Sequence, residues 1–307
     1  MAIILGAFTK KDNPMNYKHV LMAGLLLFMT IVTGSVRASS HGGVRFGLIQ
    51  GYVIVVPVVI NGVGPFDFIL DTGTTTTVID REMAAQLELQ AKDRLELITM
   101  AGTRALPRSW LHSLAVGTLS EENVEVVWME LRAEQSVSPK IRGLLGQGFL
   151  SKVNYLIDYR AKLLRFESAG DMEYRLAGTR LKTELQDGKI VIRTDDKRPL
   201  GLSLDSGAPV TLIFNSPSGK AGADIYKLDT VSAKISSGRG SREAYMGLLK
   251  RLRIGNKTFL DLPVALVRIP DGSEGAAQDG VLPTNLFSAI YVNNEKDFVI
   301  LNPRFHQ

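Results

Sequence analysis

The chain has 307 residues, enough for one large domain or two of ordinary size. With 45% apolar and 22% charged residues, its composition is typical of a folded protein and excludes a disordered one. The formal charge is +5, but setting residues 1–38 aside leaves 32 basic against 30 acidic residues. A nearly neutral chain without a basic block gives no support to a nucleic-acid partner.

The first 38 residues have the pattern of a secretory signal peptide. A basic start is followed by a short apolar stretch from Val20 to Gly34 and then by the small residues around Ala38. This stretch is shorter than the roughly 20 residues that span a membrane. The pattern therefore predicts cleavage after Ala38 and a secreted or periplasmic protein. The alternative is an uncleaved anchor, which would hold the protein on a membrane, facing away from the cytoplasm.

After this leader, the sequence predicts an all-β chain with few helices. Short β-branched and aromatic runs alternate with glycine-containing turns, and a first hairpin is expected over 51–62 and 66–71. A helix is expected over 80–89, where an aspartate precedes good helix formers. Single helical turns are expected within 147–152 and 283–290.

The second half of the chain repeats the first. Asp71 and Asp205 each follow an apolar run and precede a small hydroxylated residue and glycine. Each aspartate is followed in sequence by the same four features in the same order: a glycine-rich turn, a strand–turn–strand run, an apolar segment and a closing hairpin. Such internal similarity predicts two copies of one β unit. We place the first lobe at 39–178 and the second at 179–307.

The repeated segments resemble parts of a known family. Asp71-Thr72-Gly73-Thr74 and Asp205-Ser206-Gly207-Ala208 resemble the catalytic loops of pepsin-like and retropepsin-like aspartic proteases. The segments RGLLGQGFL (142–150) and DGVLPTNLF (279–287) resemble the strand that threads through each loop in that family. The resemblance covers about residues 44–305. It implies a single-chain, bilobed protein of the bacterial secreted type, with two similar β-barrel lobes and an active-site cleft between them.

The resemblance implies that Asp71 and Asp205 activate water for peptide-bond hydrolysis. Two carboxyl groups about 3 Å apart cannot both ionise comfortably and share one proton, as is established for aspartic proteases. The ionised member accepts a proton from water, and the protonated member polarises the carbonyl group of the substrate. Gly73 and Gly207 allow the sharp turn that follows each aspartate.

Hydroxyl groups are expected to support the two loops. The resemblance implies that the hydroxyls of Thr72 and Ser206 form hydrogen bonds to the opposite loop. It also implies that Thr74 donates to the outer oxygen of Asp71. Ala208 offers the second aspartate no such hydroxyl. We therefore predict that Asp71 is the more readily ionised member of the pair.

A glycine-rich hairpin follows each aspartate by about 30 residues, and the first of the two is interpreted as a flap. In the first copy, four residues would close over a substrate held as an extended strand: Met100, Ala101, Gly102 and Thr103. An exposed β-turn would explain the glycine equally well. No tyrosine lies near this tip, which differs from pepsin. The matching turn at 236–242 receives no role.

The sequence lacks the motifs of other common catalytic systems. The sequence has no cysteine, no H-E-x-x-H and no G-x-S-x-G, and its four histidines are too dispersed to suggest a metal site. We expect no metal ion and no organic cofactor.

The leading hypothesis is a monomeric aspartic endopeptidase that acts on peptide or protein substrates. It would contact a membrane only if the leader stays uncleaved. The alternative is a catalytically inactive peptide-binding protein on the same scaffold. Pro283 motivates this alternative, because it stands where the first repeat has Gly146 and could disturb the second loop.

Overall fold

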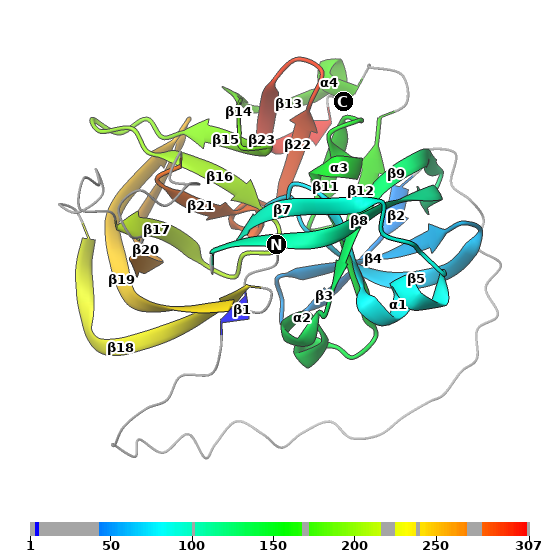
Figure 1. Ribbon diagram of the computed structural model, residues 1–307. Helices are drawn as coiled ribbons and strands as arrows, with labels where there is room; N and C mark the ends of the chain where they lie inside the picture. Colours follow the sequence, from blue (N-terminus) through cyan, green and yellow to red (C-terminus); the bar gives the residue numbers. More distant parts are fainter. Residues whose placement is uncertain are drawn as a thin grey trace, which may run out of the picture.

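The computed structural model describes residues 4–5, 43–99, 102–167, 172–215, 225–237, 240–268 and 278–305. Two similar β lobes lie side by side, and a third sheet joins them (Figure 1). The predicted all-β class with two similar lobes is confirmed. The leader predicted at 1–38 lies outside the described residues except for Ile4 and Leu5, which form a short strand, β1.

An eight-stranded sheet builds the first lobe. Its strands are β3 Gly47–Ile49, β4 Val53–Ile60, β5 Val63–Leu70, β6 Thr77–Asp80, β7 Asp93–Thr99, β8 Gly102–Val116, β9 Leu119–Met129 and β10 Ile141–Leu145. They are ordered β3-β4-β5-β10-β6-β9-β8-β7. Strand β10 is the predicted threading segment. It runs parallel to β5, with Leu145 beside Leu70.

A nine-stranded sheet builds the second lobe. Its strands are β1 Ile4–Leu5, β14 Glu184–Gln186, β15 Lys189–Arg193, β16 Gly201–Asp205, β17 Thr211–Asn215, β18 Ile225–Ser237, β19 Gly240–Ile254, β20 Lys257–Arg268 and β21 Gly280–Pro283. From β14 they run β14-β15-β16-β21-β17-β20-β19-β18, and β1 is added at the far edge. Strand for strand, this is the order of the first lobe. The duplication predicted from the sequence is therefore confirmed by the topology.

The closing hairpins of both halves form a six-stranded sheet between the lobes. Its strands are β13 Leu176–Lys182, β23 Phe298–Phe305, β22 Ala289–Asn293, β11 Tyr155–Asp158, β12 Leu163–Phe166 and β2 Gly43–Arg45, in that spatial order. Strands β11 and β22 pair antiparallel and so join the two halves. The boundary placed between residues 178 and 179 falls inside β13 and stays a prediction.

Five short helices lie among the described residues: α1 Arg81–Gln86, α2 Arg132–Val137, α3 Gln147–Leu150, α4 Met172–Arg175 and the 3-10 helix η1 Thr284–Leu286. The sequence predicts α1, α3 and η1. The Asp80 side chain caps α1 by accepting from the Met83 N–H at 2.6 Å. Helices α2 and α4 were missed because α2 has no capping side chain and α4 has only four residues.

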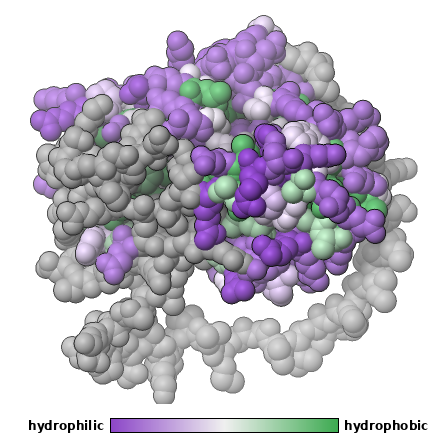
Figure 2. Space-filling model, in the orientation of Figure 1, coloured by the Kyte–Doolittle hydropathy of each residue, from purple (hydrophilic) through white to green (hydrophobic). Residues whose placement is uncertain are grey.

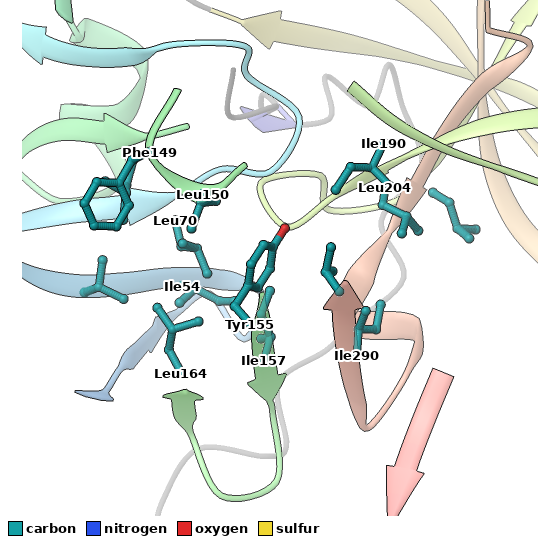
Figure 3. Close-up of a cluster of buried hydrophobic side chains, with 14 of the residues drawn as sticks. Ile54, Leu70, Phe149, Leu150, Tyr155, Ile157, Leu164, Ile190, Leu204 and Ile290 are labelled. Carbon is teal, nitrogen blue, oxygen red and sulfur yellow. The ribbon is translucent and has the colours of Figure 1, made fainter. Parts of the chain in front are cut away.

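One hydrophobic core spans both lobes and the joining sheet. It includes Leu70 and Leu204, the residues that precede the two aspartates, together with Tyr155 and Ile290 from the joining sheet. Figure 3 shows Leu70 and Leu204 on either side of the Tyr155 ring. Burying each leucine contributes about 1.5–3 kcal/mol to folding. The same packing therefore brings the two aspartate loops toward each other.

The coloured part of the face in Figure 2 is mostly hydrophilic, with small separate apolar patches, which is typical of a surface in contact with water. Within the ranges described above, no helix is both long and apolar enough to cross a membrane.

Candidate active site

Asp71 and Asp205 occupy equivalent places in the two lobes. Asp71 follows the last residue of β5, and its N–H donates to the Leu145 carbonyl of the threading strand at 3.0 Å. Asp205 is the last residue of β16 and lies beside Pro283 of the parallel strand β21. Both aspartates are almost completely buried. The duplicated sheets thus deliver one carboxylate from each lobe to the junction between them.

Thr72 and Ser206 tie the two loops together by a symmetrical exchange of hydrogen bonds. The Thr72 N–H donates to Ser206 Oγ at 3.1 Å, and the Ser206 N–H donates to Thr72 Oγ1 at 3.0 Å. Each hydroxyl then donates across the junction, Thr72 to the Leu204 carbonyl at 3.0 Å and Ser206 to the Leu70 carbonyl at 2.7 Å. All four bonds are buried, so they hold the loops in one relative position. This is the exchange that the resemblance implies.

The glycines after the aspartates permit close contact. The Gly73 N–H donates to Asp71 Oδ1 at 3.0 Å, and the Gly207 N–H donates to Asp205 Oδ1 at 2.7 Å. A Cβ atom on Gly73 would lie 2.3 Å from Asp205 Oδ2. The carboxylate of the second lobe therefore packs directly against the backbone of the first loop, in space that no side chain at position 73 could share.

The environment of the pair favours a proton on Asp205. Burial is the main cause and the negative charge of Asp71 the second, and together they raise the pKa of Asp205 from its ordinary value to about 7. The Gly207 N–H and the charge of Lys189 act in the opposite direction and are weaker. Asp205 thus keeps a proton in acid and up to nearly neutral pH. That Asp71 is the more readily ionised member stays a prediction.

Thr74 is buried beside the first loop, and its N–H donates to the Asp71 carbonyl at 3.3 Å. The donation predicted from its hydroxyl to the Asp71 carboxylate stays a prediction.

Pro283 is accommodated together with a second change, at Ala208. In the first lobe, a Cβ atom on Gly146 would lie 2.3 Å from the Thr76 carbonyl oxygen and 2.5 Å from Thr74 Cγ2. In the second lobe, Ala208 replaces Thr74 and has no Cγ2 atom, so one of these two obstructions is absent. Pro283 ends β21 with φ −62° and ψ 131° and still lies in register with the second aspartate. The predicted departure from the family pattern therefore leaves the strand pairing intact.

One residue that the sequence did not reveal, Gln147, supports the first loop from behind. Gln147 is buried, its Nε2 donates to the Thr72 carbonyl at 2.9 Å, and its N–H donates to the Thr74 carbonyl at 2.9 Å. Its counterpart in the second lobe is Thr284, whose hydroxyl lies 2.5 Å from that of Tyr159. Their only sequence signal is their position directly after the Leu-Gly and Leu-Pro pairs of the threading segments.

The predicted flap is a hairpin of β7 and β8, with Thr99 paired to Gly102. It extends from the first lobe toward the second (Figure 1). Gly102 and Thr103 begin β8, whereas Met100 and Ala101 lie outside the described residues. Strands β18 and β19 form the equivalent hairpin, and the edge of β18 pairs with β1. Substrate contact by either hairpin stays a prediction.

In the described part of the chain, no group of three or more His, Asp or Glu side chains is arranged to hold a metal ion. The junction brings together two carboxyl groups, one from each lobe, and such a pair can hold one proton between its members.

The sequence model of the family described as aspartyl protease matches residues 56–149, which contain Asp71 and the threading strand of the first lobe. The fold is that of an aspartic protease. The predicted resemblance is thereby confirmed at the level of fold. A comparison with curated proteins found no match.

Similar solved structures include a retropepsin-like aspartic protease from Rickettsia conorii, with 18% identity and a TM-score of 0.33 over 41% of this chain and 89% of that one. Basic 7S globulin from soybean has 8% identity and a TM-score of 0.45 over 85% and 94% of the two chains. Conglutin gamma from lupine seeds has 7% identity and a TM-score of 0.45 over 84% and 93%. At such low sequence identities, these structural similarities carry no information about activity.

Proposed function

We propose that the protein is an aspartic endopeptidase that hydrolyses peptide bonds by water held between Asp71 and Asp205. The observation that supports this proposal is the buried junction, where the Thr72–Ser206 exchange fixes one carboxylate from each lobe and the pKa of Asp205 is raised. A pair with one proton can serve as base and acid at once.

In the proposed reaction, ionised Asp71 accepts a proton from water while the water oxygen attacks the carbonyl carbon of the peptide bond. The proton of Asp205 passes to the carbonyl oxygen, which gives a neutral tetrahedral diol. Asp71 then donates its proton to the leaving nitrogen as the C–N bond breaks, and Asp205 recovers a proton from the diol. Every proton is returned, so the pair is ready for another turnover.

The substrate in this proposal is a peptide or protein segment in extended form, bound where the two lobes meet. The mature chain would begin at Ser39 and act as a monomer outside the cytoplasm, in the periplasm or medium. N-terminal sequencing of the protein from the producing cell tests this location. A chain that keeps its leader would support the membrane-anchored alternative.

Cleavage of a peptide library tests the activity itself. We expect wild type to cleave, and Asp71→Asn and Asp205→Asn each to lower the rate on the order of 10³-fold or more. Asp67→Asn is a matched control, because Asp67 lies on the same strand, β5, outside the junction. Equal residual activity in wild type and Asp71→Asn would contradict the proposal.

The second candidate is a peptide-binding protein without catalysis. It is favoured by the departure from the family pattern at Pro283 and Ala208. Binding of library peptides by wild type, with no cleavage over a broad pH range, would support it.

A further inference from the structure

A hairpin of the second lobe, β14–β15, reaches the catalytic loop of the first. Its turn residues Asp187 and Gly188 have φ of 49° and 71° and so lie in the left-handed region. A Cβ atom on Gly188 would lie only 3.1 Å from Cγ2 of Thr75. Next to the turn, the Gln186 carbonyl accepts from Nε2 of the buried Gln278 at 3.2 Å. The hairpin tip is therefore fixed against the loop that carries the first aspartate.

The residue directly after this turn is a lysine, Lys189, the first residue of β15. The following residue, Ile190, is buried in the core and lies beside Leu204 in Figure 3. Because side chains alternate along a strand, Lys189 points to the opposite face from Ile190. It is half-buried, and among the described residues it has no ion-pair partner. Its positive charge acts on Asp205, whose pKa it lowers.

The first lobe has a valine, Val53, at the equivalent position, because Val53 is paired with Ile49 across its hairpin as Lys189 is paired with Gln186. There the turn residues Gln50 and Gly51 have φ of 53° and 79°, and the Tyr52 N–H donates to the Ile49 carbonyl across the turn at 3.2 Å. Val53 is buried, whereas Lys189 is half-buried. Each lobe thus has one such position at the start of the strand that pairs with its aspartate-bearing strand, and only the second lobe has a charge there.

We propose that Lys189 is a specificity-determining residue that selects peptides with a glutamate or aspartate on one side of the scissile bond. A lysine that has no ion-pair partner among the described residues, on a hairpin whose tip packs against the first aspartate loop, is complementary to a carboxylate on the substrate. The equivalent position of the first lobe, Val53, carries no such charge. This inference rests on the proposed function, because it concerns the peptide bound at the same junction.

The test uses pairs of peptides that differ only by glutamate or glutamine at each of three positions on either side of the cleaved bond. We expect wild type to prefer glutamate by roughly tenfold in kcat/KM at a position on one side only. Lys189→Met should abolish the preference, Lys189→Arg should keep it, and Lys189→Glu should reverse it toward lysine-containing peptides. The preference should weaken as salt is raised, because ions screen a partly exposed pair. Lys197→Met, at an exposed site of the same lobe, is the control and should leave the ratio unchanged.

A glutamate-to-glutamine ratio near one at every position in wild type would overturn the inference, and so would a preference that survives Lys189→Met. The same peptides are also titrated by fluorescence anisotropy against the Asp71→Asn chain with and without Lys189→Met. Tighter binding of the glutamate peptide that is lost with Lys189→Met supports the inference. It does so even if wild type cleaves no peptide, a result that would contradict only the proposed function. Equal binding of both peptides would contradict the inference and leave the proposed function standing.

Discussion

Thr72 and Ser206 each accept a hydrogen bond from the other's N–H and each donate to the carbonyl that precedes the other's aspartate. They are 134 residues apart in sequence, and their bonds link the two aspartate loops directly. Through these bonds, the position of each carboxylate depends on the position of the opposite lobe.

Removing either hydroxyl should weaken both stability and catalysis. Thr72→Ala would leave the buried Ser206 N–H and Leu204 carbonyl without partners, at a cost of about 1–3 kcal/mol for each. We expect a lower midpoint of urea unfolding and a kcat lowered about tenfold or more. Thr72→Ser keeps the hydroxyl and should restore most of both quantities. An alanine variant with wild-type stability would show that the link is dispensable.

Gly73→Ala should inactivate the protein through a steric effect on the opposite lobe. The new Cβ atom would meet Asp205 Oδ2 at 2.3 Å, so the carboxylate or the loop must shift. A displacement of about 1 Å in such a site lowers kcat on the order of 10²-fold. Gly47→Ala on β3 is the matched control, because nothing lies within 4 Å of its added Cβ. Full activity in Gly73→Ala would contradict the close approach.

The rate should depend on pH through the proton on Asp205. Its pKa is raised to about 7, so the singly protonated pair is lost as the pH rises through neutrality. We expect kcat/KM to fall above about pH 7, with an apparent pKa that belongs to the pair. The profile of Asp67→Asn should match that of wild type. A rate that stays constant from pH 6 to 9 would exclude Asp205 as the proton donor.

Stability should depend on pH through the same group. Asp205 ionises near its usual value of 3.8 in the unfolded chain but only near 7 in the folded one. The folded state therefore binds more protons between these values, and the free energy of unfolding should fall as the pH rises through this window. Asp205→Asn cannot ionise, so the fall should be smaller in this variant. Urea unfolding at pH 5 and pH 8 measures the difference, and equal slopes for the two proteins would refute it.

Ala208 and Pro283 should be coupled energetically. Ala208→Thr restores the side chain of the first loop and places a methyl group near the proline that replaces Gly146. We expect the single variant to lose about 1–3 kcal/mol of stability through overpacking. The double variant Ala208→Thr with Pro283→Gly should recover most of this loss. A double-mutant cycle by urea unfolding measures the coupling, and strictly additive effects would show that the two changes are independent.

Much of the fold could be predicted because its signals are local and occur twice. Apolar alternation and glycine turns mark strands wherever they stand in the chain, and the repeat of the Asp71 segment at Asp205 marks two equivalent halves. The strand order of the two lobes then follows the repeat. The short helices α2 and α4 escaped prediction because neither carries a capping signal or a long periodic pattern.

The supports of the candidate site were decided by the tertiary structure. Gln147 contacts Thr72 from 75 positions away, and Tyr159 meets Thr284 across 125 positions and from the other half of the chain. Contacts between distant residues leave no periodic trace in sequence, since each partner is an ordinary polar residue in its own segment. The sequence by itself singled out Asp71 and Asp205 as the two candidate carboxyl groups. Only the packing of two lobes on one core decided how they are held and that the pKa of Asp205 is raised, because burial and Coulomb interactions depend on distances that chain order does not contain.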